Sequence, residues 1–333
     1  MDRRHFIIAT GTGILAAPAL IRSAHSADKV QFLLNWYLYG EHAPFFLGRK
    51  LGLFEKEGID LTIMEGRGSG VTLQAVGAKS AQFGHVDMSA VVRAGIQGAP
   101  VVSTGVLLQK NPQSAMGFAE KNIRTANDLK GKTVATTPGD ALSQVWPAFL
   151  KKANLKDSDV RLVQGDAQTK LNAVISGQAD VLLGYSHDQS MKIKDATGKP
   201  VFPVMFSDYG VNAVATGIVA HRDTLSGSPD LVRRFMRAAT LSAEAAEKNP
   251  GAAAEAMLEA DSKAGKKDTL QEGFELSAKL YRITADQRPF HTNPGAVKDT
   301  VDLLVEYGGV NPVAKEKLNT FFTTEFLPGK ATN

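Results

Sequence analysis

The chain has 333 residues and contains no cysteine. This absence excludes disulfide bonds, thiolate metal sites and cysteine nucleophiles. It also excludes a lipid anchor attached to a cysteine at the cleavage site of an exported protein. No second histidine or carboxylate stands at metal-ligand spacing from His42, so we expect no metal and no cofactor.

An excess of charge of one sign is also missing, because 38 lysines and arginines face 34 aspartates and glutamates. The formal net charge is +4, and residues 1–27 supply half of it. The sequence has no basic run with interleaved aromatic residues, which is the pattern typical of nucleic-acid binding. We therefore expect no nucleic-acid partner.

Long hydrophobic runs are absent too, since no run matches the roughly 20 apolar residues that a membrane-spanning helix needs. The apolar run 7–20 is too short, but it follows Arg3-Arg4 and precedes small residues at 24–27. These are the parts of a signal peptide. We expect cleavage of residues 1–27 on export to the periplasm, by the twin-arginine route that the arginine pair favours or by the general secretory route. A buried first helix is the alternative.

Length and a regular alternation of patterns are what the chain does contain. The roughly 300 residues after the leader exceed one compact core, so two lobes are expected. Strands are predicted at 30–34, 59–63 and 101–108, and helices at 43–54 and 71–78. Such alternation implies βαβ units and a largely parallel sheet.

A second block repeats this alternation. Its predicted elements are a strand, a helix, a strand, a helix and a strand at 133–136, 141–152, 159–163, 169–176 and 181–184. A third block over 229–326 is helical, and its alanine-rich run and many charges indicate surface helices packed on one lobe. The second block therefore predicts a second α/β unit.

Several segments carry a resemblance to a known family. They are Asn35-Trp36-Tyr37, Glu41 to Gly48, Lys50 to Asp60, Ala81-Gln82-Phe83-Gly84, Asp128 to Lys132, Gly177 to Asp180 and Val232 to Phe235. In this order they resemble type II periplasmic binding proteins of ABC importers, in the branch for thiamine pyrimidine precursors, sulfonates, taurine and nitrate. The chain is most similar to the type that binds thiamine pyrimidine precursors.

This resemblance implies an α/β fold of two lobes, each a mainly parallel sheet flanked by helices. Two crossover strands near 114–119 and 216–221 would join lobe 1, comprising 28–117 and 218–333, to lobe 2, comprising 118–217. The ligand would lie in the cleft between the lobes and be buried by closure about the crossovers. The implied partners are a small molecule and the permease subunits of an importer, and we expect a monomer.

Aromatic residues just after the first predicted strand are the first binding candidates. Trp36, Tyr37 and Tyr39 offer planar faces to a flat heterocycle or a cation, with packing of the loop on its own lobe as the alternative. His42 matches the histidine of the pyrimidine-precursor branch, so the resemblance implies hydrogen bonding to a heterocycle. Capping of the following helix is its alternative role.

Further candidates in lobe 1 also follow predicted strands. Gly68 and Ser69 precede a helix whose free amides attract anions. In sulfonate and nitrate binders the corresponding place helps to hold the anionic group, whereas a loop that merely needs glycine is the alternative. Ser89 comes after a strand that ends near Asp87, and its hydroxyl is a candidate donor to the ligand.

Five candidates lie in lobe 2. Gly139 and Asp140 form a strand-to-helix turn that faces the first lobe. Tyr185 and Asp188 follow another strand, where the pyrimidine-precursor branch has an aromatic residue and then a glutamate. A carboxylate there accepts hydrogen bonds from an aminopyrimidine, although Asp188 is shorter than the family's glutamate. Asn212 belongs to a segment that also resembles this branch.

These features predict capture of a small planar heterocycle, similar to a thiamine pyrimidine precursor, for an ABC importer. Binding of a sulfonate or other small organic anion is one alternative, and a periplasmic sensor subunit is another. We expect no enzyme, because no Ser/His/Asp motif, nucleotide fingerprint or metal cluster stands out. The eukaryotic thiamine-pyrimidine synthases that share this fold carry a cysteine-rich segment, which the chain lacks.

Overall fold

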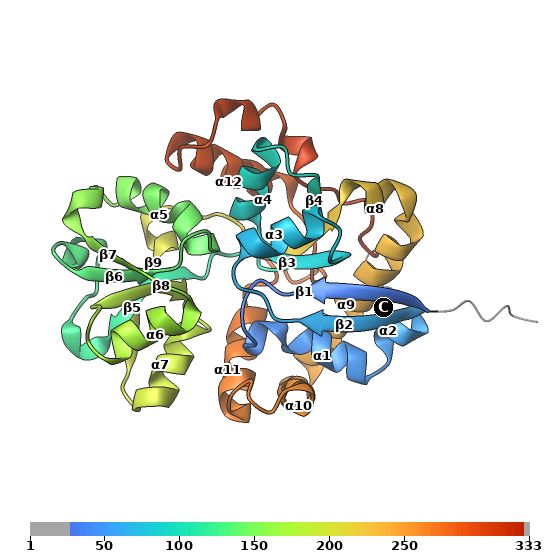
Figure 1. Cartoon of the computed structure of the whole chain (residues 1–333), viewed down its shortest axis with the longest axis horizontal. Coiled ribbons are helices and arrows are strands. Elements are labelled where there is room, and N and C mark those ends of the chain that lie inside the picture. The colour runs from blue at the N-terminus through green and yellow to red at the C-terminus, as the bar shows by residue number, and fades with distance from the viewer. Residues whose placement is uncertain (1–26, 330–333) are drawn as a thin grey trace, which may run out of the picture.

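The computed structural model describes residues 27–329, and their strands form two separate sheets (Figure 1). The first sheet has the order β2-β1-β3-β10-β4, with β1 (Asp28–Leu33), β2 (Ile59–Met64), β3 (Phe83–Asp87), β4 (Val101–Val106) and β10 (Thr216–His221). The second has the order β7-β6-β8-β5-β9, with β5 (Gln113–Phe118), β6 (Thr133–Thr136), β7 (Arg161–Gln164), β8 (Val181–Tyr185) and β9 (Val201–Met205). We call each sheet with its helices lobe 1 and lobe 2.

Each sheet is mainly parallel, with one antiparallel strand in the fourth position. In lobe 1, β1 pairs in parallel with β2 and β3, while β10 is antiparallel to β3 and β4. In lobe 2, β6 pairs in parallel with β7 and β8, while β5 is antiparallel to β8 and β9. The antiparallel strand is in each case the one that follows a crossing from the other lobe. The predicted α/β fold with two mainly parallel sheets is confirmed.

Helices flank both sheets (Figure 1). Those of lobe 2 are α5 (Ala141–Lys152), α6 (Ala167–Ile175) and α7 (Gln189–Thr197). Those of lobe 1 are α1 (Ala43–Lys50), α2 (Leu53–Lys56), α3 (Ser69–Gly77), α4 (Met88–Ile96), α8 (Arg222–Gly227), α9 (Pro229–Lys248), α10 (Pro250–Ala260), α11 (Lys267–Ala278) and α12 (Pro294–Glu306). Three of these reach the other lobe, because α4 and α12 contact α5 and α11 contacts α7.

Most predicted elements are present with small shifts at their ends. The strand 133–136 and the helix 141–152 are confirmed at both ends. The pattern predicts a single helix over 43–54, whereas the structure has α1 and α2. The break comes at Gly52, whose φ of 65° lies in the left-handed region that interrupts a helix.

The chain crosses between the lobes at 107–112 and 211–215, on either side of the second sheet. The sequence predicts crossover strands near 114–119 and 216–221, but these residues form β5 and β10 inside the sheets. The difference arises because an extended segment that enters a sheet finds backbone hydrogen-bond partners there. A lobe boundary placed at 117 therefore cuts β5, which lies wholly in the second sheet.

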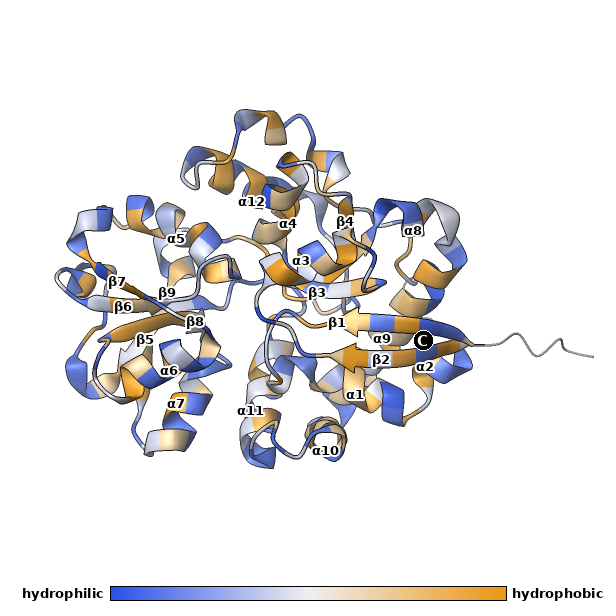
Figure 2. Cartoon of the chain, in the orientation of Figure 1, coloured by the Kyte–Doolittle hydropathy of each residue, from blue (hydrophilic) through white to orange (hydrophobic). Residues whose placement is uncertain are grey.

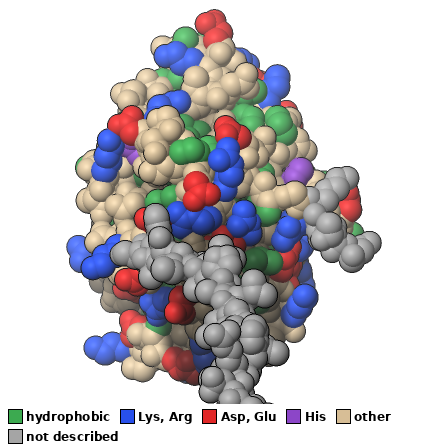
Figure 3. All heavy atoms as spheres, turned by 90° about the vertical axis from the view of Figure 1, so that its right-hand side faces the viewer, with side chains coloured by type: hydrophobic (Ala, Val, Ile, Leu, Met, Phe, Trp, Pro, Cys, Tyr) green, Lys and Arg blue, Asp and Glu red, His purple; other side chains and the backbone are tan. Residues whose placement is uncertain are grey.

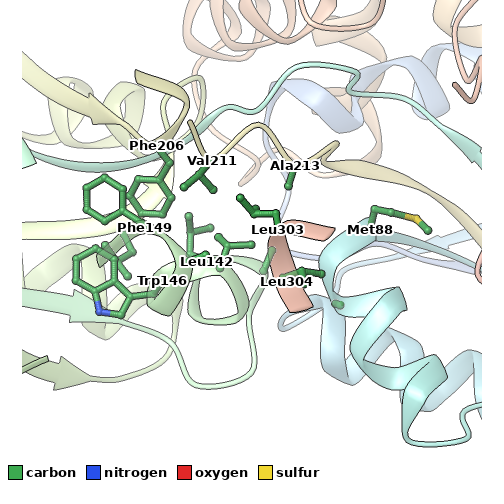
Figure 4. Packing of buried hydrophobic residues seen from close by; sticks show 14 of the residues in the cluster. Met88, Leu142, Trp146, Phe149, Phe206, Val211, Ala213, Leu303 and Leu304 are labelled. Atoms are coloured by element: carbon green, nitrogen blue, oxygen red, sulfur yellow. The ribbon is translucent and has the colours of Figure 1, made fainter. Parts of the chain in front are cut away.

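Apolar packing continues from one lobe to the other behind the crossings. Leu142 of α5 and Leu303 of α12 belong to one buried cluster with Val211 and Ala213 of the second crossing, and Figure 4 shows these side chains gathered between the lobes. The two crossings are also tied together, because the Asn111 side-chain amide donates to the Val211 carbonyl over 2.7 Å. The lobes thus share a contact region next to the two crossings.

The surface is polar and of mixed charge. In Figure 2 hydrophobic residues follow the strands, while hydrophilic residues gather on outer helices such as α7 and α8. Figure 3 shows lysines and arginines interspersed with aspartates and glutamates on one end of the molecule. Within residues 27–329, no helix is both long enough and apolar enough to cross a bilayer. The predicted signal peptide lies outside the described residues except for Ala27.

Candidate functional site

A cavity lies between the lobes, at the carboxyl ends of parallel strands from both sheets, where ligands bind in open α/β folds. Water-sized spheres can occupy about 30 Å³ of it, and the space between its walls is about 330 Å³ when the opening to solvent is counted. The residues that line it are Asn35, Trp36, Tyr39, Gly68, Ser69, Asp140, Ala141, Leu142, Lys170, Tyr185, Asp188 and Gln189. Seven of the predicted site residues are among them, namely Trp36, Tyr39, Gly68, Ser69, Asp140, Tyr185 and Asp188.

Two loops of lobe 1 hold each other in place at the cavity wall. The Gly66 amide donates to the Trp36 carbonyl over 3.1 Å, and the Gly68 amide donates to the Asn35 carbonyl over 2.7 Å. A Cβ atom on Gly66 would come within 1.8 Å of the Leu34 carbonyl oxygen, and Gly68 has a φ of 121°. The glycines are therefore needed for close approach and backbone conformation, and α3 begins directly after them.

The aromatic residues after β1 face in different directions. Trp36 is only 8% exposed and lines the cavity, and its buried Nε1 has no hydrogen-bond acceptor among the described residues. The Tyr37 hydroxyl instead reaches across to lobe 2 and donates to the two carboxylate oxygens of Asp188, over 3.3 and 3.1 Å. Trp36 thus offers an aromatic ring to a ligand, while Tyr37 positions a carboxylate.

A lysine and an aspartate form the wall contributed by lobe 2. Asp140 accepts a hydrogen bond from the Ser143 amide over 2.8 Å and so caps the first turn of α5. Lys170 of α6 is 2% exposed, and its ammonium donates to the Leu183 carbonyl over 2.8 Å. The same ammonium lies 3.4 Å from Asp140 Oδ2 and 5.0 Å from the centre of the Trp36 ring. The charges of this wall are paired but remain next to the cavity.

Two buried carboxylates take part in contacts between the lobes. Burial raises the pKa of Asp188 to about 6, although the Tyr37 hydroxyl and nearby cations oppose the shift. Burial likewise raises the pKa of Asp87 to about 6, and Asp87 Oδ2 accepts a hydrogen bond from the Tyr185 hydroxyl over 2.8 Å. Each of these pairs joins one residue of lobe 1 to one of lobe 2, so both belong to the closed arrangement of the lobes.

A third contact between the lobes is centred on Glu41, which is fully buried. Its carboxylate accepts hydrogen bonds from Tyr39 over 3.0 Å, from His85 and His187 over 2.8 Å each, and from Thr216. Burial by itself would raise the pKa of Glu41, but the hydrogen bonds from His187 and His85 hold it well below its usual value. Among these donors only His187 belongs to lobe 2.

His42 lies behind the cavity wall, in contact with this cluster. It is fully buried, and its Nε2 is 2.8 Å from Asn35 Oδ1. Burial and the neighbouring His85 lower its pKa well below the usual value, which favours the neutral ring. Its side chain makes no cap hydrogen bond at the start of α1. His42 therefore orients Asn35, which does line the cavity.

The remaining predicted residues lie outside the lining. The Ser89 hydroxyl donates to Asp87 Oδ1 over 2.6 Å, and Asp87 is the residue that caps α4. Ser89 is therefore part of this helix cap. Gly139 has its carbonyl near Gly70 on the opposite lobe. Asn212 lines a separate pocket beside α12, with Lys152 among its neighbours. The structure does not bring Asn212 together with the aromatic residues.

The sequence reading missed Lys170 and Gln189, and it did not single out Glu41. Gln189 accepts a hydrogen bond from the Tyr185 amide over 2.8 Å and donates to the Tyr37 hydroxyl over 3.1 Å. Lys170 stands in an ordinary amphipathic helix, and nothing in the local pattern distinguishes it from an exposed lysine. Within residues 27–329, no group of three or more histidines and carboxylates is arranged to hold a metal ion.

A comparison with known families now identifies the chain's relatives. The family described as NMT1/THI5 like matches residues 40–253, more than half of the chain. The chain belongs to this NMT1/THI5-like family. Most residues that line the cavity fall within the matched segment, while Asn35, Trp36 and Tyr39 precede it.

Curated relatives of this NMT1/THI5-like chain carry the name of an enzyme. The 4-amino-5-hydroxymethyl-2-methylpyrimidine phosphate synthase of Legionella pneumophila is 25% identical over 236 residues, which cover 70% of this chain and 74% of that protein. The synthase of the same name from Schizosaccharomyces pombe is 25% identical over 223 residues, covering 64% of each chain. The match thus leaves about a third of the yeast protein uncovered.

Two solved structures with the same fold are named as binding proteins. The alkanesulfonate-binding protein SsuA from Xanthomonas axonopodis pv. citri, bound to MOPS, has a TM-score of 0.67 and 14% identity over 85% of this chain and 94% of that one. The periplasmic nitrate-binding protein NrtA from Synechocystis PCC 6803 has a TM-score of 0.69 and 10% identity over 90% and 87% of the two chains. The resemblance to periplasmic binding proteins is confirmed at the level of the fold.

The expectation that the chain is not an enzyme is contradicted by the names of these relatives. Relatives at about 25% identity are named as pyrimidine phosphate synthases, so membership of this family includes enzymes. The absence of cysteine and of familiar catalytic motifs excluded only the chemistry that uses them. One lysine and two carboxylates, Lys170, Asp140 and Asp188, line this cavity, and such side chains are common acids and bases in catalysis.

Proposed function

We propose that the protein captures a small planar heterocycle, similar to a thiamine pyrimidine precursor, in the cavity between its lobes. The observation that carries this proposal is the small cavity between the lobes, lined by Trp36 of lobe 1 and Asp188 of lobe 2. The indole supplies a flat apolar face, and the carboxylate accepts hydrogen bonds from an amino group on the ring. Tyr37 and Gln189 fix the carboxylate in place.

Closure of the lobes is the proposed capture step. Glu41 to His187, Asp87 to Tyr185 and Tyr37 to Asp188 are polar contacts that exist only when the lobes are together. A ligand that fills the cavity adds further contacts to both walls and so favours the closed state. We propose that the permease of an ABC importer recognises this closed state, in the periplasm, with the leader 1–27 directing export.

Mass spectrometry of the ligand that co-purifies with the protein, released by denaturation, tests the proposed class. We expect a planar heterocycle with an amino group. A thermal-shift screen supports the identification, since a ligand at 100 times its dissociation constant adds roughly 2.7 kcal/mol to the free energy of unfolding. Stabilisation by sulfonates alone, with none by pyrimidines, contradicts the proposal.

A small organic anion is the second candidate ligand. Gly68 and Ser69, at the N-terminus of α3, line the cavity, and a helix N-terminus of this kind attracts negative charge. The facing N-terminus of α5 is already capped by the Asp140 carboxylate, which disfavours an anion on that side. The thermal-shift screen therefore includes a sulfonate series beside the pyrimidines.

Pyrimidine phosphate synthesis is a second candidate activity, favoured by the names of the relatives. We would test it by expressing residues 28–333 in the cytoplasm of a bacterium that cannot make the thiamine pyrimidine. Growth without added pyrimidine supports synthesis. Growth that needs traces of pyrimidine in the medium, and that improves only with the exported chain and its permease, supports uptake.

A further inference from the structure

Lys170 is a buried cation whose partners leave it facing the cavity. Its ammonium carries three protons, and a buried ammonium needs hydrogen-bond partners to offset the loss of water. One partner is the Leu183 carbonyl at 2.8 Å, and a second, at the longer distance of 3.4 Å, is Asp140 Oδ2. Asp140 is shared, because its other oxygen caps α5.

The third neighbour of the ammonium is an aromatic ring. Lys170 Nζ lies 5.0 Å from the centre of the Trp36 ring, within the range of a cation–π contact. Lys170 comes from lobe 2 and Trp36 from lobe 1, so this contact forms only across the cavity. A flat ligand that stacks on this face of Trp36 must meet the ammonium or push it aside.

The hydrogen-bonding group that faces this side of the cavity is a positively charged donor. Lys170 lines the cavity, whereas the Trp36 Nε1 is buried and lies beside the Tyr37 hydroxyl. A ligand with an acceptor atom here receives a hydrogen bond from Lys170. A ligand with a fixed positive charge would lie against a like charge, which is costly in a buried site.

We infer that Lys170 determines ligand specificity, by donating to a ring nitrogen or carbonyl of the ligand and by excluding rings with a permanent positive charge. The inference rests on the proposed function and deepens it. The ligand then has an acceptor edge toward Lys170 and an amino group toward Asp188. Asp140 and Asp188 also face the cavity and attract cations, so the preference for uncharged rings depends on Lys170.

Isothermal titration calorimetry with two probes of the same ring tests this assignment. The probes are 4-amino-5-hydroxymethyl-2-methylpyrimidine and its N-methylated cation. Lys170→Gln removes the charge but keeps a donor for the Leu183 carbonyl, and Lys170→Arg keeps the charge. Lys199→Gln is the matched control, because Lys199 lies 5.2 Å from the Phe118 ring on the same lobe but outside the cavity.

We expect the wild type to bind the uncharged ring at least about tenfold more tightly than the cation. In Lys170→Gln the uncharged ring weakens about tenfold while the cation gains affinity, so that the preference is lost or reversed. Lys170→Arg and Lys199→Gln keep the wild-type preference. A purely structural role for Lys170 would weaken both probes equally, because it has no reason to distinguish their charges.

Equal loss for both probes in Lys170→Gln, or tighter binding of the cation by the wild type, overturns the inference and leaves the proposed function standing. Absence of binding of either probe to the wild type overturns the proposed function, and the inference falls with it. Thermal unfolding of each variant without ligand shows that it is folded. If Lys170→Gln does not fold, the wild-type preference for the uncharged probe and its retention in Lys170→Arg decide the question.

Discussion

The two lobes have nearly the same sheet topology but unequal walls. Lobe 1 presents Trp36 and Tyr39 to the cavity and keeps its carboxylate Glu41 buried behind them. Lobe 2 presents the charged groups of Asp140, Lys170 and Asp188 directly. We propose that lobe 1 supplies the flat surface and the rigid support, while lobe 2 binds the polar atoms of the ligand.

The largest effect is expected from Glu41→Gln, which changes the buried carboxylate behind the cavity wall of lobe 1. The amide replaces one acceptor oxygen by a donor, although four groups donate to this carboxylate. Leaving buried donors unpaired should lower the free energy of unfolding by about 3 to 5 kcal/mol. Urea denaturation followed by circular dichroism measures the loss.

Glu65→Gln is the control for this change. Glu65 is exposed and accepts one hydrogen bond, from the Leu38 amide over 2.9 Å, so its loss should cost under about 1 kcal/mol. A similarly small cost for Glu41→Gln would show that the buried network does not support lobe 1.

Trp36→Ala tests the flat surface of lobe 1. If the ring stacks on the indole, the variant should bind 4-amino-5-hydroxymethyl-2-methylpyrimidine roughly 100-fold more weakly in calorimetry, as loss of a central aromatic contact does. Trp146→Phe, in the core of lobe 2, changes the other tryptophan and should leave affinity within a few-fold of the wild type. Near-unchanged binding by Trp36→Ala would remove stacking from the proposal.

Asp188→Asn tests whether lobe 2 binds the polar atoms of the ligand. It should lower ligand affinity but raise the stability of the unliganded protein. Ligand affinity should fall about tenfold at pH 8, because the charged acceptor is lost. The unliganded variant should nevertheless be more stable than the wild type at that pH, since it no longer buries a carboxylate whose ionisation burial disfavours.

The pH dependence of this second effect has a defined sign. The pKa of Asp188 is raised from 3.8 to about 6, so the folded protein keeps the proton to higher pH than the unfolded chain. This contribution to stability is full below pH 3.8 and is lost as the pH rises through about 6. Relative to Asp188→Asn, the wild type should lose about 1 to 3 kcal/mol between pH 4 and pH 8. Asp208 is exposed, so the stability of Asp208→Asn should change with pH in the same way as that of the wild type. If the stability of Asp188→Asn also changes in this way, the pH dependence does not come from Asp188.

Asn212→Ala should have the smallest effect. Asn212 lines the pocket beside α12 and not the cavity between the lobes, so its loss should change ligand affinity less than twofold in calorimetry. A tenfold loss would mean that the second crossing contributes to binding and that the comparison of the two walls is incomplete.

Much of the site could be predicted because it follows local rules. Residues at the carboxyl ends of strands reach the cleft, so Trp36, Gly68 and Tyr185 could be identified from the strand patterns together with the family resemblance. Lys170 was missed because it stands inside a helix, where a single lysine on a partly apolar face usually points to water. Only the packing of α6 between Asp140 and Leu183 buries it.

The sequence by itself determined the α/β class, the order of strands and helices, and the aromatic residues after β1, since each depends on periodicity and turn residues that are read locally. The tertiary structure decided which of these residues face one another. The Glu41 carboxylate meets His187 over 146 positions of sequence, and Tyr37 meets Asp188 over 151. Such contacts follow from closure of the two lobes, and no short stretch of chain contains the information that brings them together.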